Sequence, residues 1–171
     1  MLNKILVAID ESGSSDWAFD TAIAMAKSLE AQLLLVHVLD SSSPDSPKSP
    51  CALVGSLLMD RESAAQNEYE QELQKFEDYY DTFLKQKQTE AESAGVTASY
   101  LQTYGLPEQK LCEIAKKNSI DLIVAGNRDR TNSNSISNYL VRHAPCSVTV
   151  VHPKAHYETA SQTSRREAVS V

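Results

Sequence analysis

Short apolar runs alternate with longer amphipathic stretches through most of the chain. Residues 5–9 (ILVAI) and 33–39 (LLLVHVL) are almost uninterrupted aliphatic runs, which is typical of strands buried on both faces. Between these two runs the apolar positions recur at helical spacing, at Ala18, Ala22, Met25 and Leu29. A strand, a helix and a second strand in this order predict a right-handed βαβ unit with parallel strands.

The middle of the chain differs in character from both of its ends. Residues 41–60 begin with a Ser/Pro-rich segment that has few apolar side chains, so we expect a flexible loop inserted after the second strand. From Arg61 to Ala94 a helical pattern follows, and Gly95 ends it. Its apolar stripe consists of Tyr69, Leu73, Phe76, Tyr80 and Phe83. A helix of this length exceeds what a small sheet needs, so its first turns are expected to project, to kink or to pack on a partner subunit.

The next elements repeat the alternation of strand and helix. Residues 96–104 alternate between apolar and polar side chains, as expected for a strand near the edge of a sheet. Gly105 and Pro107 then begin a helix, because proline fits the first helical turn.

The stretch from Asp121 to Val151 contains the clearest functional signal. Residues 122–125 predict a buried strand that turns at Gly126 into a polar loop. A short helix ending near His143 and a final strand at residues 148–151 complete the stretch. A strand that delivers a glycine-bearing loop to a helix N-terminus is a standard way to hold a phosphate group.

This order of elements predicts a three-layer α/β fold with a five-stranded parallel sheet. We expect a single domain over residues 1–153, followed by a disordered tail at residues 154–171. In such sheets ligands bind beyond the carboxyl ends of the strands, where the strand order reverses.

Composition narrows the class of protein. The net charge of −7 argues against sequence-independent binding of nucleic acid, which rests on Lys and Arg neutralising phosphates. No apolar run approaches the roughly 20 residues of a membrane helix, and the N-terminus has no secretory cleavage site. Three scattered cysteines fit a reducing cytoplasm. Cys112 and Cys146 are predicted core residues, and Cys51 an inert, exposed thiol.

Few residues have the chemistry of a site, and each has a plainer interpretation. Asp10 ends the first strand, where its carboxylate can accept hydrogen bonds from a ribose or simply order a turn. Gly126 allows a positive φ and a close approach of phosphate to the backbone, or is an ordinary turn glycine. Arg128 and Arg130 can bind a phosphate or remain solvated. Ser135 can cap the following helix and still leave N–H groups free for a phosphate.

The histidines do not suggest catalysis. His143 is predicted to be structural, capping carbonyl groups at a helix end, and His37 to be a core residue with its polar atoms satisfied. The sequence contains no paired catalytic carboxylates, no motif for an activated nucleophile and no metal cluster. The chain is therefore not expected to be an enzyme, although a slow ATPase activity stays open.

Three segments together resemble the universal stress protein family: VAIDES, VHVLD and DLIVAGNR…SISNYLVRHAPCSVTVV. The resemblance covers residues 1–40 and 96–153. It implies a Rossmann-like fold of the adenine nucleotide alpha hydrolase type and a role in the stress response. It also implies binding of an adenine nucleotide (AMP, ADP or ATP) and a homodimer formed through the last strand, Val148 to His152. It names no protein partner.

The family's nucleotide-binding pattern is incomplete in this chain. That pattern is Gly, two residues, Gly, nine residues, Gly, then Ser or Thr, and here only Gly126 and Ser135 match it. Asp129 and Asn134 replace the other two glycines, and four residues take the space of nine. Asp129 would repel a phosphate charge at ~4 Å by about 4 kcal/mol at an effective dielectric near 20. We therefore expect AMP or ADP to be favoured over ATP.

By resemblance, Ala8, Asp10 and Val38 would frame the adenine and the ribose. The full set of expected cofactor-binding residues is Ala8, Ile9, Asp10, Val38, Gly126, Asn127, Arg128, Asn134, Ser135 and Ile136. Asp10 would meet a metal only through Mg²⁺ carried by the nucleotide.

Two other interpretations were weighed. A universal stress protein that binds no nucleotide and acts as a dimeric scaffold remains an alternative. A phosphoacceptor receiver domain needs an acceptor aspartate after its third strand and a lysine after its last strand. Here the third strand leads to Gly105 with no aspartate, and the last strand runs directly into His152 and Pro153, so this class of protein is excluded.

Overall fold

The computed structural model describes residues 1–43, 46–49, 59–127 and 135–152, without the side chains of residues 59–63. Five parallel strands form one sheet in the order β3-β2-β1-β4-β5. They are β1 (Lys4–Ala8), β2 (Gln32–Leu39), β3 (Ala98–Tyr104), β4 (Leu122–Gly126) and β5 (Ser147–Val151). Four helices lie between them: α1 (Gly13–Leu29), α2 (Met59–Ser93), α3 (Pro107–Lys117) and α4 (Ile136–His143). The predicted three-layer α/β fold with five parallel strands is confirmed.

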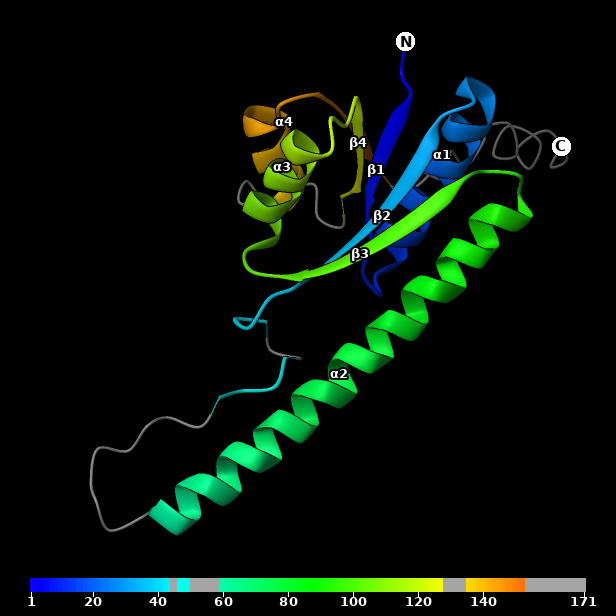
Figure 1. Ribbon diagram of the computed structural model, residues 1–171. Coiled ribbons are helices and arrows are strands. Elements are labelled where there is room, and N and C mark those ends of the chain that lie inside the picture. Colours follow the sequence, from blue (N-terminus) through cyan, green and yellow to red (C-terminus); the bar gives the residue numbers. More distant parts are fainter. Residues whose placement is uncertain (44–45, 50–58, 128–134, 153–171) are drawn as a thin grey trace, which may run out of the picture.

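Helices cover both faces of the sheet (Figure 1). On one face α1 and α2 pack against Ile5, Val7 and other side chains of the central strands. On the opposite face α3 and α4 pack against Leu6 and Ile123. Successive strand residues point to opposite faces, so a central strand must be apolar at nearly every position. The continuous aliphatic runs in the sequence have this cause.

The two edge strands are β3 and β5. The prediction of an edge strand at residues 96–104 is confirmed, although β3 begins two residues later, at Ala98. The final strand begins one residue earlier than predicted, at Ser147, and all five of its residues are half-buried or exposed. Gly126 was predicted to leave the strand, but it pairs with Val151 as the last residue of β4.

Serine caps define two of the helix starts, and one of them, at Ser135, was predicted from the sequence. The Ser12 side chain accepts a hydrogen bond from the Ser15 N–H at the start of α1, and Ser135 does the same for Asn138 at the start of α4. Both bonds satisfy N–H groups that a helix leaves without an internal partner. Pro107 occupies the first turn of α3, as predicted.

Helix α2 is far longer than the sheet requires. Its 35 residues span about 52 Å at 1.5 Å per residue, and its first half projects beyond the sheet as a straight rod (Figure 1). Its buried anchors, Tyr80, Leu84 and Ala91, all lie in its second half. Met59 and Asp60, which were expected in the loop at residues 41–60, belong to the helix. Residues 44–45 and 50–58 of that segment lie outside the described residues.

The remaining expectations concern the cysteines, the C-terminal tail and membrane spans. Cys112 and Cys146 are half-buried beside the α3–α4 core rather than inside it, which corrects the prediction of full burial. Cys51 and residues 154–171 lie outside the described residues. Within the described residues, no helix combines the length and the apolar character needed to cross a membrane.

Candidate functional site

A pocket of about 620 Å³ opens at the carboxyl ends of β1 and β2. The strand order reverses next to this pocket, between β1 and β4, where α1 lies on one face of the sheet and α3 and α4 on the other. Five of the expected site residues line the pocket: Ala8, Ile9, Asp10, Val38 and Ile136. They come from three segments that are far apart in the sequence. The fold therefore brings together the residues expected around the nucleoside.

Asp10 orders the turn after β1 and also lines the pocket. Its Oδ1 atom accepts hydrogen bonds from the N–H and the hydroxyl of Ser12, the first at 2.7 Å. Its own N–H donates to Ser15 Oγ at 2.9 Å. Asp10 thus orders the turn between β1 and α1. Its side chain is still exposed and lines the pocket, and its Oδ2 atom has no hydrogen bond within the described residues.

His37 forms an inner wall of the pocket. Its side chain is 6% exposed, and its ring stacks on that of Tyr80 with centroids 3.8 Å apart and planes inclined by 14°. Burial lowers the pKa of His37 to about 4, although the charges of Asp10 and Glu11 act in the opposite direction. The ring is therefore neutral near pH 7. The prediction of a core histidine is confirmed, but its Nδ1 atom has no hydrogen-bond partner in the described chain.

The sequence did not indicate that α2 takes part in the site. Phe76 and Tyr80 line the pocket from this helix. The Tyr80 hydroxyl donates to Glu11 at 3.2 Å, and the Tyr79 hydroxyl donates to the same carboxylate. Burial, and then the charge of Glu11, raises the pKa of Tyr80 to about 12. The helical stripe that contains Phe76 and Tyr80 was visible in the sequence, but it did not show that the stripe passes the end of β2.

The charges around the pocket are all of one sign. Its lining includes the carboxylates of Asp10, Glu11 and Asp40, and no Lys or Arg among the described residues. Such a pocket disfavours a phosphate group and suits the uncharged part of a nucleotide. A bound phosphate would have to lie at the edge of the pocket, next to Ile136 and the start of α4.

Gly126 is required for packing, not for an unusual backbone conformation. The glycines with positive φ in the described chain are Gly95 and Gly105, so Gly126 does not use the positive φ that glycine allows. A methyl group at Gly126 would overlap the carbonyl oxygen of Ser14 and lie 2.9 Å from Ser14 Cβ. Glycine is needed here because β4 approaches the start of α1 closely.

Asn127 is the last described residue before the expected phosphate loop. It is 8% exposed, its N–H donates to the carbonyl of Val151 at 2.9 Å, and its Oδ1 atom has no partner within the described residues. His37 Nδ1 and Asn127 Oδ1 are the two such buried side-chain atoms of the described chain. Asn127 directly follows β4, and His37 lies in the last three residues of β2, so both are near the carboxyl edge of the sheet. Arg128, Arg130 and Asn134 lie outside the described residues.

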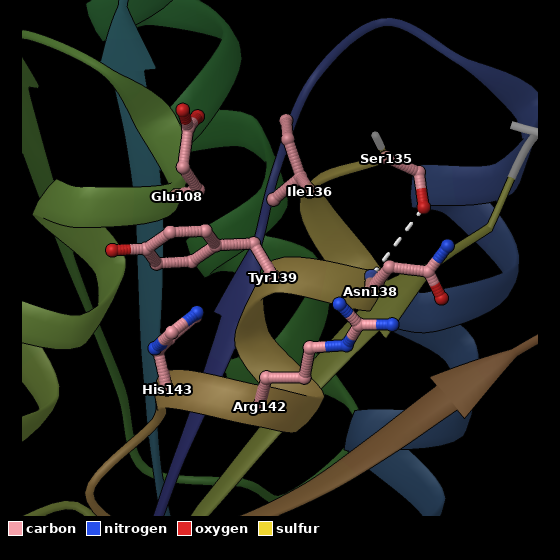
Figure 2. A pocket seen from close by; sticks show the side chains of 7 residues that line it. All are labelled: Glu108, Ser135, Ile136, Asn138, Tyr139, Arg142 and His143. Carbon is pink, nitrogen blue, oxygen red and sulfur yellow. Dashed lines mark hydrogen bonds between the residues drawn. The ribbon is translucent and has the colours of Figure 1, made fainter. Parts of the chain in front are cut away.

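A smaller pocket of about 270 Å³ lies along α4 (Figure 2). Ile136 lines both pockets, and Ser135 lines the smaller one. His143 lies there with its ring 4.3 Å from that of Tyr139. His143 is exposed and forms no hydrogen bond with the described residues, so the expectation that it caps helix carbonyls is wrong. The N–H of Ala144 bonds the Leu140 carbonyl instead.

A protein-only metal site does not form in the described part of the chain. No three His, Cys, Asp or Glu side chains there are grouped closely enough to hold an ion. Asp10 could therefore contact a metal only together with ligands from a bound molecule.

The fold and the pocket define a parallel α/β protein with a ligand site at the carboxyl edge of its sheet. The family model of the universal stress proteins matches residues 1–152. The chain belongs to the universal stress protein family. It is 30% identical over 155 residues to a Staphylococcus haemolyticus protein that carries this family name, covering 86% of this chain and 83% of the other.

Solved structures show the same fold. The universal stress protein UspA from Lactobacillus plantarum is 25% identical, with a TM-score of 0.62 over 88% of this chain and 97% of its own. An Arabidopsis thaliana family member, solved with AMP bound, is 22% identical, with a TM-score of 0.60 over 95% of this chain and 99% of its own.

Proposed function

We propose that this universal stress protein binds an adenine nucleotide in the pocket at the ends of β1 and β2, as a regulatory or sensor protein of the stress response. The observation that carries the proposal is the convergence of Ala8, Asp10, Val38 and Ile136 on one pocket from separate segments. Family members solved with AMP, cAMP and dAMP support the ligand class.

Each part of the nucleotide has a proposed position in the pocket. The base lies against Ala8, Ile9 and Val38, which offer apolar side chains and strand-end backbone groups. The ribose hydroxyls donate to the Oδ2 atom of Asp10. The α-phosphate lies at the start of α4, because a helix N-terminus leaves N–H groups without an internal partner and its dipole favours negative charge.

The charge of the pocket favours a short phosphate chain. Asp10, Glu11 and Asp40 give its lining three carboxylates and no described cation. Each additional phosphate brings further negative charge to the same edge of the sheet. AMP and ADP are therefore favoured over ATP, and Mg²⁺ carried by a nucleotide would reduce the difference.

Titration calorimetry with AMP, ADP and ATP, with and without Mg²⁺, tests the proposal. Asp10→Ala should weaken AMP binding about tenfold or more, because hydrogen bonds to a charged group contribute about 1.5–3 kcal/mol. Asp20→Ala is the matched control, since Asp20 is an exposed aspartate of α1 outside the pocket lining. Tighter binding of ATP would overturn the order of preference. If none of the three nucleotides binds, the remaining function is the alternative one, a dimeric scaffold that binds no nucleotide.

The same preparations test turnover. A phosphate-release assay with ATP is expected to show no hydrolysis above background. Hydrolysis that Asp10→Ala abolishes would establish an ATPase and overturn the expectation of a binding protein.

The proposed assembly is a homodimer through residues 148–152. Strand β5 is an edge strand with half-buried Val148, Val150 and Val151, and an apolar edge is an unfavourable surface to leave in water. Light scattering should give twice the mass of the chain, and Val150→Lys should give the monomer mass. A monomeric wild type would refute the assembly without affecting the nucleotide site.

A further inference from the structure

Tyr79 and Tyr80, the tyrosine pair of α2, connect this helix to two other parts of the pocket. Tyr80 is 9% exposed and lies where α2, the end of β2 and the turn after β1 meet. Its ring stacks on His37 of β2. Its hydroxyl donates to Glu11, which follows Asp10 in the turn. A single side chain thus contacts both strand ends that form the nucleoside pocket.

The Tyr80 ring is held on several sides. Besides the stack on His37, the Phe76 ring meets it edge-on with centroids 5.1 Å apart and planes at 73°. The Phe83 ring lies 6.4 Å away at 90°. Edge-to-face aromatic contacts of this kind contribute beyond the area that they bury. The ring therefore places its hydroxyl at a defined position relative to the turn.

Glu11 connects helix α2 to the turn between β1 and α1. It is an exposed side chain, yet both of its carboxylate oxygens accept a tyrosine hydroxyl, Oε1 from Tyr79 and Oε2 from Tyr80. Hydrogen bonds to an ionised acceptor are among the stronger ones in proteins. Without these two donors, the turn that carries Glu11 would lose its connection to α2.

We propose that Tyr79 and Tyr80 are positioning residues of the nucleotide site. By holding Glu11 they fix the turn that presents Asp10 to the ribose, and they keep the Glu11 charge at the pocket wall. The inference rests on the proposed binding of an adenine nucleotide. It makes helix α2 a functional part of the pocket, so that the affinity for a ribonucleotide depends on a helix that does not touch the phosphate.

The test removes the two hydroxyls and keeps the two rings. The double variant Y79F/Y80F should bind AMP about five- to tenfold more weakly than the wild type, the range expected for coupled hydrogen-bonded groups. Its affinity for 2′,3′-dideoxy-AMP should equal that of the wild type, because this ligand lacks the ribose hydroxyls that donate hydrogen bonds to Asp10. Tyr69→Phe is the matched control, since Tyr69 lies on the projecting half of α2 and outside the pocket lining.

Two further measurements separate positioning from a general loss of structure. Glu11→Ala should weaken AMP binding to a similar degree, and combining it with Y79F/Y80F should add no further loss. Hydrogen exchange in the ligand-free protein should become faster at the bonded N–H groups of Asp10 and Ser12 in Y79F/Y80F, but not in Tyr69→Phe.

The possible results are distinct. Equal losses for AMP and 2′,3′-dideoxy-AMP, additive losses with Glu11→Ala, or no loss in Y79F/Y80F would each overturn the positioning role while nucleotide binding stands. A wild type that binds neither ligand would overturn both the positioning role and the proposed function.

Discussion

Replacing His37 with leucine should remove most of the acid sensitivity that this histidine gives to the fold. His37 is 6% exposed and stacked on Tyr80, so the folded chain resists placing a proton on the ring. Burial lowers the pKa of His37 from 6.5 to about 4, even with Asp10 and Glu11 nearby. Leucine fills a similar volume and cannot titrate.

The sign and size follow from proton linkage. Between about pH 6.5 and pH 4 the unfolded chain binds a proton at His37 that the folded chain does not, so stability decreases as the pH falls through this range. At about 1.4 kcal/mol for each pH unit, the contribution lost between about pH 7 and pH 4 is about 3 kcal/mol. Above about pH 6.5 this contribution is fully present.

Urea unfolding followed by circular dichroism measures the effect. The free energy of unfolding is determined for the wild type and His37→Leu across this range, and the difference between the two proteins is followed with pH. Any pH-independent cost of losing the stack cancels in that comparison. The wild type should lose about 3 kcal/mol more than the variant between about pH 7 and pH 4. His143→Gln, which removes an exposed imidazole, should follow the wild type. Parallel curves for the wild type and His37→Leu would refute the reasoning.

Three further predictions concern packing and capping. Gly126→Ala should destabilise the fold by about 1–3 kcal/mol or more in urea unfolding, because its methyl group overlaps the Ser14 carbonyl. Gly13→Ala is the control and should be neutral or slightly stabilising, since the space at that position is open. Equal effects of the two substitutions would contradict the packing argument. Leu84→Ala should cost about 2–5 kcal/mol, since this α2 anchor is fully buried; a cost below about 1 kcal/mol in the same assay would mean that α2 is not anchored there. Ser135→Ala should cost about 1 kcal/mol through the lost cap of α4 and should weaken AMP binding in calorimetry, whereas unchanged stability would show that the cap bond does not form.

Much of the fold was predictable because its signals are local. Residues 5–9 and 33–39 are apolar at nearly every position, since both faces of a central strand are covered, and this pattern is visible without knowing what covers them. Ser135 and Pro107 mark helix starts through bonds and geometry that involve only the next few residues. Five of the expected site residues line one pocket, because the carboxyl ends of parallel strands meet at one edge of the sheet.

The errors came from contacts between distant segments. Gly126 was interpreted as a phosphate-loop or turn glycine, and the sequence did not show that Ser14 of another element leaves no room for a side chain there. His37 was expected to be a satisfied core residue, but its ring faces Tyr80 and its Nδ1 atom has no described partner. The sequence around each residue contains no sign of these neighbours.

The sequence alone thus determined the elements, their order, the parallel sheet and the edge of the sheet where a ligand can lie. Those properties depend on periodicity and on the few residues that follow each element, so they can be recognised from neighbours in the chain. Only the tertiary structure decided that α2 passes the ends of β1 and β2 and holds Glu11 with two tyrosines. A helical stripe specifies which face is buried, but the helix length, crossing angle and register that select its partners arise from packing the whole chain.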